Sequence, residues 1–258
     1  HEQLLTEELN NFTPNLNTLS FIDSFLERKN KKKKKVNILD WGCGRGREVL
    51  WLRLKGYNVI GVDIDNEPIN NGLVLAKQLG FEEGILQLLL DDNKTLFPEN
   101  YFDITFSNQV FEHIEDINSV AKEIHRITKK DGEGYHVFPS FMYPNEGHLH
   151  MPFVHWLPKN QIRYLIILIY VLIRREPFWP ELSNLNLLGK AKAYYNYSIN
   201  KTYYRKPKTL TNIFSNTGFN VKHGSKYIGM NSNNSFSYWQ KIKQYLRIIF
   251  KEDELYLF

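Results

Sequence analysis

The sequence predicts an α/β fold in which a parallel sheet is covered by helices on both faces. Short apolar runs alternate with helical patterns between residues 36 and 138, and a glycine-rich turn joins the first run to the first helix of the alternation. The chain has 258 residues, of which 42% are hydrophobic and 24% charged, so it can form a sizeable core. These observations predict right-handed βαβ crossovers in a single domain.

Five short apolar runs are expected to form the first strands of the sheet. They occupy residues 36–39, 59–62, 86–90, 102–106 and 135–138. Most of them end at polar residues or glycine, which is typical of strands that are buried in the middle of a parallel sheet.

Amphipathic helices are expected before and between these strands. An apolar residue recurs every three or four positions in four segments, residues 15–28, 49–54, 69–79 and 114–128. The third of these segments ends at Gly80, a residue that favours the end of a helix.

The alternation stops after residue 140 and resumes about 66 residues later. A helix at 210–215, a strand at 219–227, a helix at 238–250 and a strand at 255–258 are then expected. Residues 141–206 hold 13 of the 37 aromatic residues, with nine Lys and Arg against three Asp and Glu. We therefore predict one domain with a core of residues 1–140 and 207–258 and a helical, aromatic cap of residues 141–206.

Composition excludes several classes of protein. Cys43 is the only cysteine, so an internal disulfide and a cysteine-based zinc site are both excluded. The longest apolar run, residues 164–173, is too short to span a bilayer, and the N-terminus lacks a signal-peptide pattern, so a cytoplasmic protein is expected. Because the run is apolar all round, a buried helix is favoured over a membrane anchor or a homodimer contact.

The glycine turn predicts a ligand at the carboxyl ends of the strands, where backbone must approach the ligand closely. Its spacing is G-x-G-x-G over residues 42–46, and Arg47 stands where a dinucleotide fingerprint requires glycine, so NAD is disfavoured. Asp63 closes the second strand 17 residues beyond Gly46, near the spacing at which a carboxylate meets ribose hydroxyls. A ribose-bearing ligand without a pyrophosphate fits this pattern.

With these elements in place, the sequence resembles the class I S-adenosylmethionine-dependent methyltransferases. The matching stretches are ILDWGCGRG at 38–46, VIGVD at 59–63, DD at 91–92, FDI at 102–104, FEHI at 111–114, EIHRI at 123–127 and GFNV at 218–221. The resemblance covers residues 36–140 well and implies a Rossmann-like, seven-stranded sheet whose last strand is antiparallel. Residues 130–134 depart from the family's Pro-Gly-Gly turn before the fifth strand.

The resemblance also implies a cofactor and the residues that hold it. The cofactor would be S-adenosylmethionine and the product S-adenosylhomocysteine. The loop around the methionine part and the ribose would contain Asp40, Gly42, Gly44 and Gly46. Simpler readings stay open, since Asp40 is also a candidate helix cap and Asp103 and Glu112 are candidate surface charges.

Three further contacts follow from the resemblance. Asp63 would bind the ribose hydroxyls, and Asp91 or Asp92 would accept a hydrogen bond from the adenine amino group. The backbone near Asn108 would meet the methionyl ammonium group.

Histidines at the start of the cap are the candidates for a general base, which a hydroxyl acceptor requires. His148 and His150 would share one face if their segment is extended, and His113 follows the fourth strand. Each can instead serve packing. Glu146 with His148, His150 and His155 could also bind a metal, but spacing within a loop does not fix a ligand geometry, so no metal site is predicted.

The expected acceptor is small, polar and anionic, because the C-terminal half is basic and the cap is aromatic. Residues 141–258 contain 16 Lys and Arg against 6 Asp and Glu. A nucleotide-linked or phosphorylated sugar is favoured, and part of the cap resembles enzymes that modify sugars for bacterial surface polysaccharides. N-methylation of a small amine or phosphoamine is the alternative. A nucleic-acid acceptor is not expected, because residues 107–110, Ser-Asn-Gln-Val, stand where the Asn-Pro-Pro-aromatic motif of such enzymes would lie.

Overall fold

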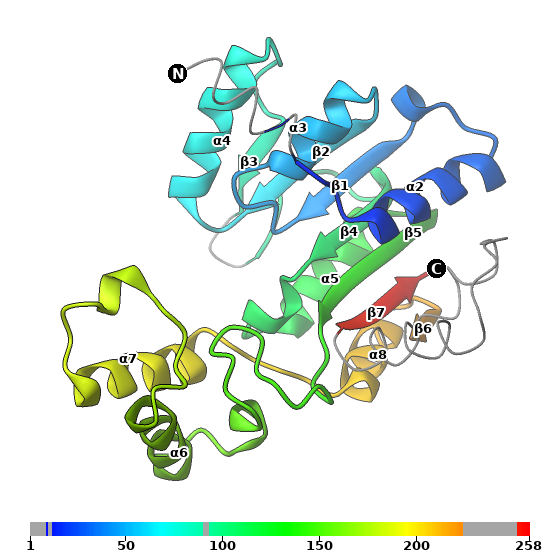
Figure 1. The fold of residues 1–258 in the computed structure, drawn as a ribbon. Helices are drawn as coiled ribbons and strands as arrows, with labels where there is room; N and C mark the ends of the chain where they lie inside the picture. The colour runs from blue at the N-terminus through cyan, green and yellow to red at the C-terminus, as the bar shows by residue number, and fades with distance from the viewer. Residues whose placement is uncertain (1–8, 10–11, 90–92, 224–251) are drawn as a thin grey trace, which may run out of the picture.

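The computed structural model describes residues 9, 12–89, 93–223 and 252–258, and it contains a seven-stranded sheet flanked by helices (Figure 1). The strand order is β3-β2-β1-β4-β5-β7-β6, in which β1 to β5 are parallel and β7 is antiparallel to both of its neighbours. The predicted Rossmann-like sheet with an antiparallel last strand is confirmed.

The seven strands lie close to the predicted positions. They are β1 (Asn37–Trp41), β2 (Asn58–Asp63), β3 (Leu86–Leu88), β4 (Phe102–Asn108), β5 (Thr128–Pro139), β6 (Val221–His223) and β7 (Glu252–Leu257). The fifth strand differs most, because β5 begins seven residues before the predicted start. Its pairing with β4 shifts register between Phe102 and Ile104, so the glycine-containing stretch that was expected to be a turn is an irregular part of the strand.

Helices cover both faces of the sheet. On one face lie α2 (Leu16–Arg28), α3 (Arg47–Leu54) and α4 (Asn66–Gln78), and on the other lie α5 (Ile117–Ile127) and α8 (Pro207–Ser215). Asn15, Asp65 and Asp116 accept hydrogen bonds from the first N–H groups of α2, α4 and α5. The cap at Asp116 explains why α5 begins later than predicted, after a short 3-10 helix, η2 (Phe111–His113).

Residues 141–206 contain two further helices that pack against each other beyond the carboxyl ends of the parallel strands (Figure 1). These are α6 (Gln161–Leu172) and α7 (Leu187–Asn200), with short 3-10 helices η3 (Val154–Trp156) and η4 (Pro180–Leu182). They share a small apolar core of their own, formed by Leu149, Met151, Val154, Ile167, Val171, Ala191 and Tyr194. The cap segment therefore has its own packing and lies at the edge where a ligand is expected.

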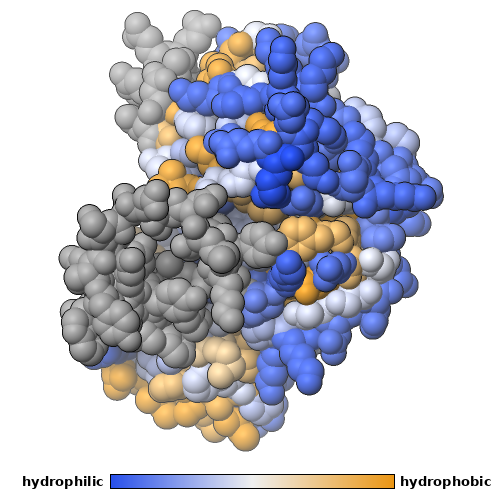
Figure 2. All heavy atoms as spheres, turned by 90° about the vertical axis from the view of Figure 1, so that its right-hand side faces the viewer, coloured by the Kyte–Doolittle hydropathy of each residue, from blue (hydrophilic) through white to orange (hydrophobic). Residues whose placement is uncertain are grey.

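Helix α6 is buried on one side only, so the prediction of a fully buried helix was wrong. Ile167 and Val171 are buried against α7, whereas Ile162, Leu165 and Ile169 are 54%, 55% and 51% exposed. Figure 2 shows the molecule turned about the vertical axis of Figure 1. Hydrophobic atoms lie at the lower end in this view, and α6 lies at the lower end in Figure 1. No helix in the described part of the chain is long and apolar enough to cross a membrane.

Asp103 is buried at the amino end of β4, so its reading as a surface charge was wrong. Its carboxylate accepts hydrogen bonds from Lys31 (2.7 Å), Lys129 (2.8 Å) and the backbone N–H of Asn37 (2.9 Å). These contacts join the starts of β1, β4 and β5. The helix expected at 238–250, part of the strand expected at 219–227, and Asp91 and Asp92 lie outside the described residues.

Candidate functional site

The glycine turn forms a loop between β1 and α3 in which three glycines have left-handed backbone conformations. Gly42, Gly44 and Gly46 have φ angles of +79°, +53° and +69°. A Cβ at Gly42 would lie 2.5 Å from the Val110 side chain, whereas a Cβ at Gly44 would meet no atom within 4 Å. The loop is therefore packed tightly at Gly42 and borders open space at Gly44.

Asp63 lies at the end of β2 and is held beside this loop. One carboxylate oxygen accepts a hydrogen bond from the N–H of Gly44 at 2.7 Å, and the other accepts from the N–H of Asp65 at 3.0 Å. Each oxygen keeps a further lone pair for a ligand hydroxyl. The carboxylate at the end of the second strand thus lies beside the glycine loop.

A cleft of about 790 Å³ runs from this loop to the cap. Gly42, Asp63 and Leu89 line it on the side of the sheet, and Tyr197 and Lys201 line it on the side of α7 and the loop that follows. Its position matches the rule that ligands of open parallel sheets bind beyond the carboxyl ends of the strands.

Asp40 is buried below the loop, in β1, with 4% of its surface exposed. Burial raises the pKa of this carboxyl well above its ordinary value, and the charges of Glu48 and Asp63 act in the same direction. Gly46, not Asp40, occupies the N-cap position of α3, so the reading of Asp40 as the cap of this helix was wrong. Asp40 is instead a buried carboxyl in β1, two residues before Gly42.

The side chain of Asn108 is turned away from the cleft and fastens the N-terminal segment to the sheet. Its amide donates to Glu48 at 2.7 Å and accepts from Thr18 at 3.0 Å and from Asn15 at 3.3 Å. The side-chain amide is thus engaged within the protein, and the contact of the backbone near Asn108 with a ligand stays a prediction.

The donor-side residues fit S-adenosylmethionine on structural grounds. The loop borders open space at Gly44, and Asp63 gives a carboxylate for two adjacent ribose hydroxyls. The binding roles of Asp40, Gly42, Gly44, Gly46, Asp63 and Asn108 remain predictions. Asp91 and Asp92, the predicted contacts of the adenine ring, lie outside the described residues.

On the cap side, two of the three predicted histidines lie together. The rings of His113, in η2, and His148, in the loop after β5, are 4.8 Å apart between centroids and meet edge to face. His113 also lines the cleft. Two segments that are 35 positions apart in the sequence thus bring their imidazoles to one place.

His150 does not join them, because the segment is a tight turn and not the extended strand that the prediction required. The N–H of His150 donates to the carbonyl of Glu146 at 2.9 Å, and its backbone has a left-handed φ of +52°. The side chain is exposed. The expectation that His148 and His150 share one face was therefore wrong, and the role of each as a base remains untested.

Glu146 holds this turn together. Its buried carboxylate accepts the N–H groups of His148 and Leu149, the hydroxyl of Tyr204 at 2.7 Å, and His148 Nδ1 at 3.2 Å. Burial would raise the pKa of Glu146, but these donors lower it below its ordinary value. Burial would likewise lower the pKa of His148, but the hydrogen bond and charge of Glu146 raise it.

Glu112 is the residue of this cluster that the sequence reading missed. It was a candidate surface charge, but it is only 3% exposed, and burial raises its pKa to about 7. Its side chain lies beside His113, at 3.7 Å from Nε2 to the nearer carboxylate oxygen. The FEHI match was the available signal, but a sequence motif does not show which of its polar residues points inward.

Three of the nine arginines and lysines of the cap hold its loops through backbone carbonyls. Arg163 is buried and donates to the carbonyls of Leu157 and Ser198, and Lys159 donates to those of Ile199 and Thr202. Arg205 donates to four further carbonyls, those of Phe111, Tyr203, Ile114 and Glu115. Lys201 is the one Lys or Arg among the described residues that line the cleft.

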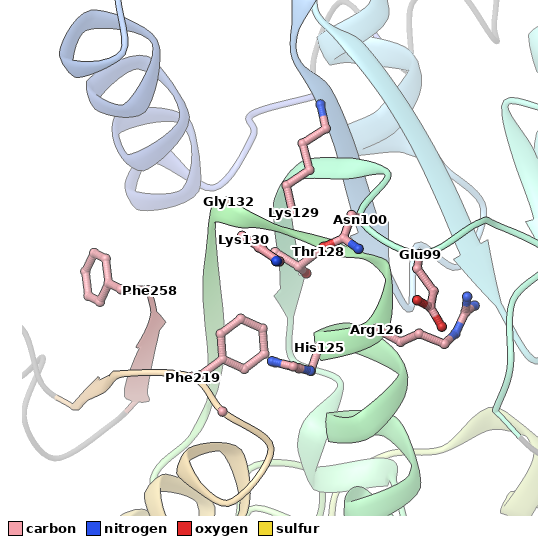
Figure 3. A pocket seen from close by; sticks show the side chains of 11 residues that line it. Glu99, Asn100, His125, Arg126, Thr128, Lys129, Lys130, Gly132, Phe219 and Phe258 are labelled. Carbon is pink, nitrogen blue, oxygen red and sulfur yellow. The ribbon is translucent and has the colours of Figure 1, made fainter.

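A second hollow, of about 440 Å³, opens at the opposite edge of the sheet, near the starts of β4 and β5 (Figure 3). Its strongest cations are already paired: Arg126 with Glu123 at 2.6 Å, and Lys129 with Asp103 at 2.8 Å. Since it lies away from the glycine loop, it does not belong to the candidate site.

Residues 39–135 match a family model described as a methyltransferase domain. The chain is 32% identical over 107 residues to a ubiquinone biosynthesis O-methyltransferase of Pseudomonas syringae pv. tomato, covering 42% of this chain and 45% of the relative. It is 29% identical over 103 residues to a sterol 24-C-methyltransferase of Aspergillus fumigatus, covering 39% and 27%. The matches therefore span less than half of these curated relatives.

Solved structures share the fold at low sequence identity. An S-adenosylmethionine-dependent methyltransferase from Mesorhizobium loti aligns with a TM-score of 0.52 and 14% identity, covering 86% of this chain and 90% of that one. A phosphoethanolamine N-methyltransferase 2 of Haemonchus contortus, solved with phosphomonomethylethanolamine and S-adenosylhomocysteine, aligns with a TM-score of 0.51 and 16% identity, covering 91% and 50%. These likenesses establish the fold, and the family match ends before the cap.

Proposed function

We propose that this chain, which carries an S-adenosylmethionine-dependent methyltransferase domain, transfers a methyl group to a hydroxyl of a small polar acceptor. The observation that carries the proposal is the continuous cleft of about 790 Å³. Gly42 and Asp63 line it at the donor end, and His113 and Tyr197 line it at the cap end. Donor and acceptor bound in one cleft can be held in line, which is the main requirement of a methyl transfer.

When bound, S-adenosylmethionine supplies an electrophilic methyl group on its sulfonium. The glycine loop would hold the methionine part and the ribose through backbone groups, with Asp63 on the ribose hydroxyls. Asp91 or Asp92 would accept from the adenine amino group, and the backbone near Asn108 would meet the ammonium group. These contacts orient the donor and leave the acceptor side to the cap.

The acceptor hydroxyl would lose its proton at the histidine pair of His113 and His148. The two imidazoles lie together where η2 meets the cap, and Glu146 fixes the orientation of His148. His150 is the weaker candidate because its side chain is exposed and is not in contact with the pair in the described structure.

The narrower proposal for the acceptor is a nucleotide-linked or phosphorylated sugar, as in the building of bacterial surface polysaccharides. Tyr197 and Tyr203 offer aromatic faces for a sugar ring, Asn200 offers an amide, and Lys201 offers a cation. The cations that hold the cap loops together are not available for this contact, so the phosphate would depend mainly on Lys201. A small amine or phosphoamine, held against the same tyrosines, remains the alternative.

The test is transfer of labelled methyl from S-adenosylmethionine to panels of nucleotide-sugars, sugar phosphates, phosphoamines and RNA. We expect turnover with a hydroxyl acceptor, a loss of at least about tenfold in His148→Gln, and no loss in His125→Gln, an exposed histidine at the opposite edge. Turnover with amines alone would replace the hydroxyl proposal, and no transfer to any acceptor despite donor binding would contradict the enzymatic role.

We further propose that the exposed apolar side of α6 is a contact between two copies of this chain. Ile162, Leu165 and Ile169 form a strip without charge, and such a strip is complementary to the same strip of a second copy. Sedimentation equilibrium of the protein would detect this association, and a monomer at all concentrations would exclude it.

A further inference from the structure

The carboxylate of Glu112 is buried without a hydrogen-bond partner among the residues that the structure describes. Its side chain is 1% exposed, and neither Oε1 nor Oε2 has a donor within reach. A buried carboxylate normally accepts several hydrogen bonds or binds a cation, because an uncompensated polar group in the interior is costly. A cation bound beside this carboxylate would offset the cost of its burial.

His113 presents a lone pair beside this carboxylate. Its Nδ1 lies 2.7 Å from the carbonyl oxygen of Lys201, and a carbonyl can only accept, so Nδ1 carries the proton. Nε2 is then unprotonated in the neutral ring, and it is the atom that lies 3.7 Å from Glu112 Oε1. A backbone carbonyl that fixes the tautomer in this way is a frequent outer contact of metal-binding histidines.

The tautomer of His148 is fixed in the same way, by the carboxylate of Glu146. Its Nδ1 lies 3.2 Å from Oε1 of Glu146, whose own position is fixed by Tyr204 and by two backbone N–H groups. The proton on Nδ1 leaves Nε2 as the unprotonated nitrogen. The arrangement of carboxylate, histidine and open nitrogen is that of a metal ligand oriented by its outer shell.

We propose that Glu112, His113 and His148 bind one divalent transition-metal ion, of the zinc type. One ligand atom from each residue lies within 4.8 Å of the other two. Metal bonds of about 2.1 Å at tetrahedral angles place ligand atoms about 3.4 Å apart, so the longest of these separations must shorten by up to roughly 1.4 Å to complete the site. Two imidazoles and one carboxylate leave coordination positions open, which is typical of catalytic rather than structural sites.

The metal site would act on the acceptor, and this part rests on the proposed function. Of the three ligands, His113 lines the cleft, so the ion would lie beside the space in which an acceptor would bind. An acceptor oxygen bound to the ion would lose its proton to water at a lower pH, attack the methyl carbon, and leave the electron pair of the broken carbon–sulfur bond on sulfur. The two imidazoles would then be ligands, and the ion would take the place of a histidine base. An acceptor with two adjacent hydroxyls fits such a site best.

Calorimetric titration of Zn²⁺ into the chelator-treated full chain tests this proposal. We expect one ion per chain with micromolar or tighter affinity, weakened at least about tenfold in Glu112→Gln and in His148→Gln. His150→Gln is the matched control, because it removes a histidine from the same loop outside the cluster, and it should bind Zn²⁺ like the wild type. Far-ultraviolet circular dichroism of every variant, together with the visible spectrum of the Co²⁺-loaded wild type, separates loss of ligands from loss of fold.

The outcomes are distinct for the two proposals. Absence of Zn²⁺ binding to the wild type would overturn the metal site. Zn²⁺ binding that is equally strong in Glu112→Gln and His148→Gln would also overturn it and would indicate adventitious binding at surface histidines. S-adenosylmethionine titrated into the same samples judges the proposed function separately. Donor binding without zinc binding would support the methyltransferase proposal and contradict the metal site. Zinc binding without donor binding would support the metal site and contradict the methyltransferase proposal.

Discussion

The donor side and the acceptor side of the cleft are built in different ways. The donor side depends on backbone: a glycine loop and one carboxylate, all within residues 42–63 and joined by the 2.7 Å contact of Gly44 to Asp63. The acceptor side depends on side chains from three separate segments, which contribute Glu112 and His113, Glu146 and His148, and Tyr204. Local sequence therefore determines the first region, and tertiary packing determines the second.

This difference has a physical reason. A left-handed glycine conformation is a property of one residue and its neighbours, so a short motif carries it wherever the same turn occurs. A cluster of polar side chains forms only if several loops meet, and each loop depends on contacts such as those of Arg163 and Arg205 with backbone carbonyls. We therefore expect substitutions on the donor side to lower the affinity for S-adenosylmethionine, and substitutions on the acceptor side to lower turnover.

The largest effect is expected from Gly42→Ala. A Cβ there would lie 2.5 Å from Val110 on a backbone with φ +79°, so strain and overpacking together should cost about 2–4 kcal/mol. We expect a lower melting temperature and an S-adenosylmethionine affinity reduced at least about tenfold, measured by thermal unfolding and calorimetry.

Gly56→Ala is the control for backbone strain alone. Gly56 has φ +85°, but a Cβ there meets nothing within 4 Å, and it lies at the end of α3. This variant should lose about 1–2 kcal/mol of stability and no donor affinity. Equal losses of donor affinity in both variants would show that the loop has no special role.

The next largest effect is expected from Glu146→Gln on the acceptor side. The amide cannot accept all of the hydrogen bonds that the carboxylate takes from His148, Leu149 and Tyr204, so the turn should lose its geometry. We expect turnover to fall about 10- to 100-fold with unchanged donor affinity. Glu181→Gln, an exposed position in η4, is the matched control, and a parallel loss of donor affinity would contradict the separation of the two sides.

A smaller effect with a defined pH dependence is expected from Asp103→Asn. Burial alone would raise the pKa of Asp103, but hydrogen bonds from Lys129, Lys31 and the Asn37 N–H lower it below 3.8. The charged form thus stabilises the fold above about pH 4, and this contribution is lost as the pH falls through the lowered pKa.

We expect Asp103→Asn to cost about 1–2 kcal/mol at pH 7 and progressively less towards pH 3, with donor affinity intact at neutral pH. Melting temperatures of both proteins across this range measure the difference. A gap between wild type and variant that stays constant from pH 7 to pH 3 would contradict the assigned ion pairs.

The smallest effect on stability is expected from Leu165→Glu. The side chain is 55% exposed on α6, so the free energy of unfolding should change by less than about 0.5 kcal/mol. If this strip joins two copies, the variant should be monomeric in sedimentation at concentrations where the wild type is a dimer. A marked loss of stability in a monomer would show that α6 is packed more completely than its exposure indicates.

Much of the fold was predictable because its signals are local. The strand and helix periodicities located β1 to β4 and α2 to α4 closely, and the resemblance supplied the antiparallel last strand. The start of β5 was not predictable, since its glycine-containing stretch reads as a turn and is drawn into the sheet only by pairing with β4. The exposed side of α6 was also missed, because its sequence is apolar on every face.

The candidate site was predictable to a lesser extent. Asp63 and the glycine loop follow from spacing, and His113 and His148 were selected individually. No single stretch of sequence predicts that these two histidines meet, that Glu112 is buried or that Tyr204 contacts Glu146. All three depend on how distant loops pack. His150 was included because its segment was read as extended, and the turn around Glu146 removes it.

Calorimetric titration of S-adenosylmethionine into the wild type and into Asp63→Ala tests the central claim most directly. The account predicts one donor molecule bound per chain with micromolar affinity, and a loss of at least about tenfold when the carboxylate beside Gly44 is removed. Absence of binding to the wild-type protein, or equal affinity in both proteins, would contradict the assignment of the cleft as a methyl-donor site.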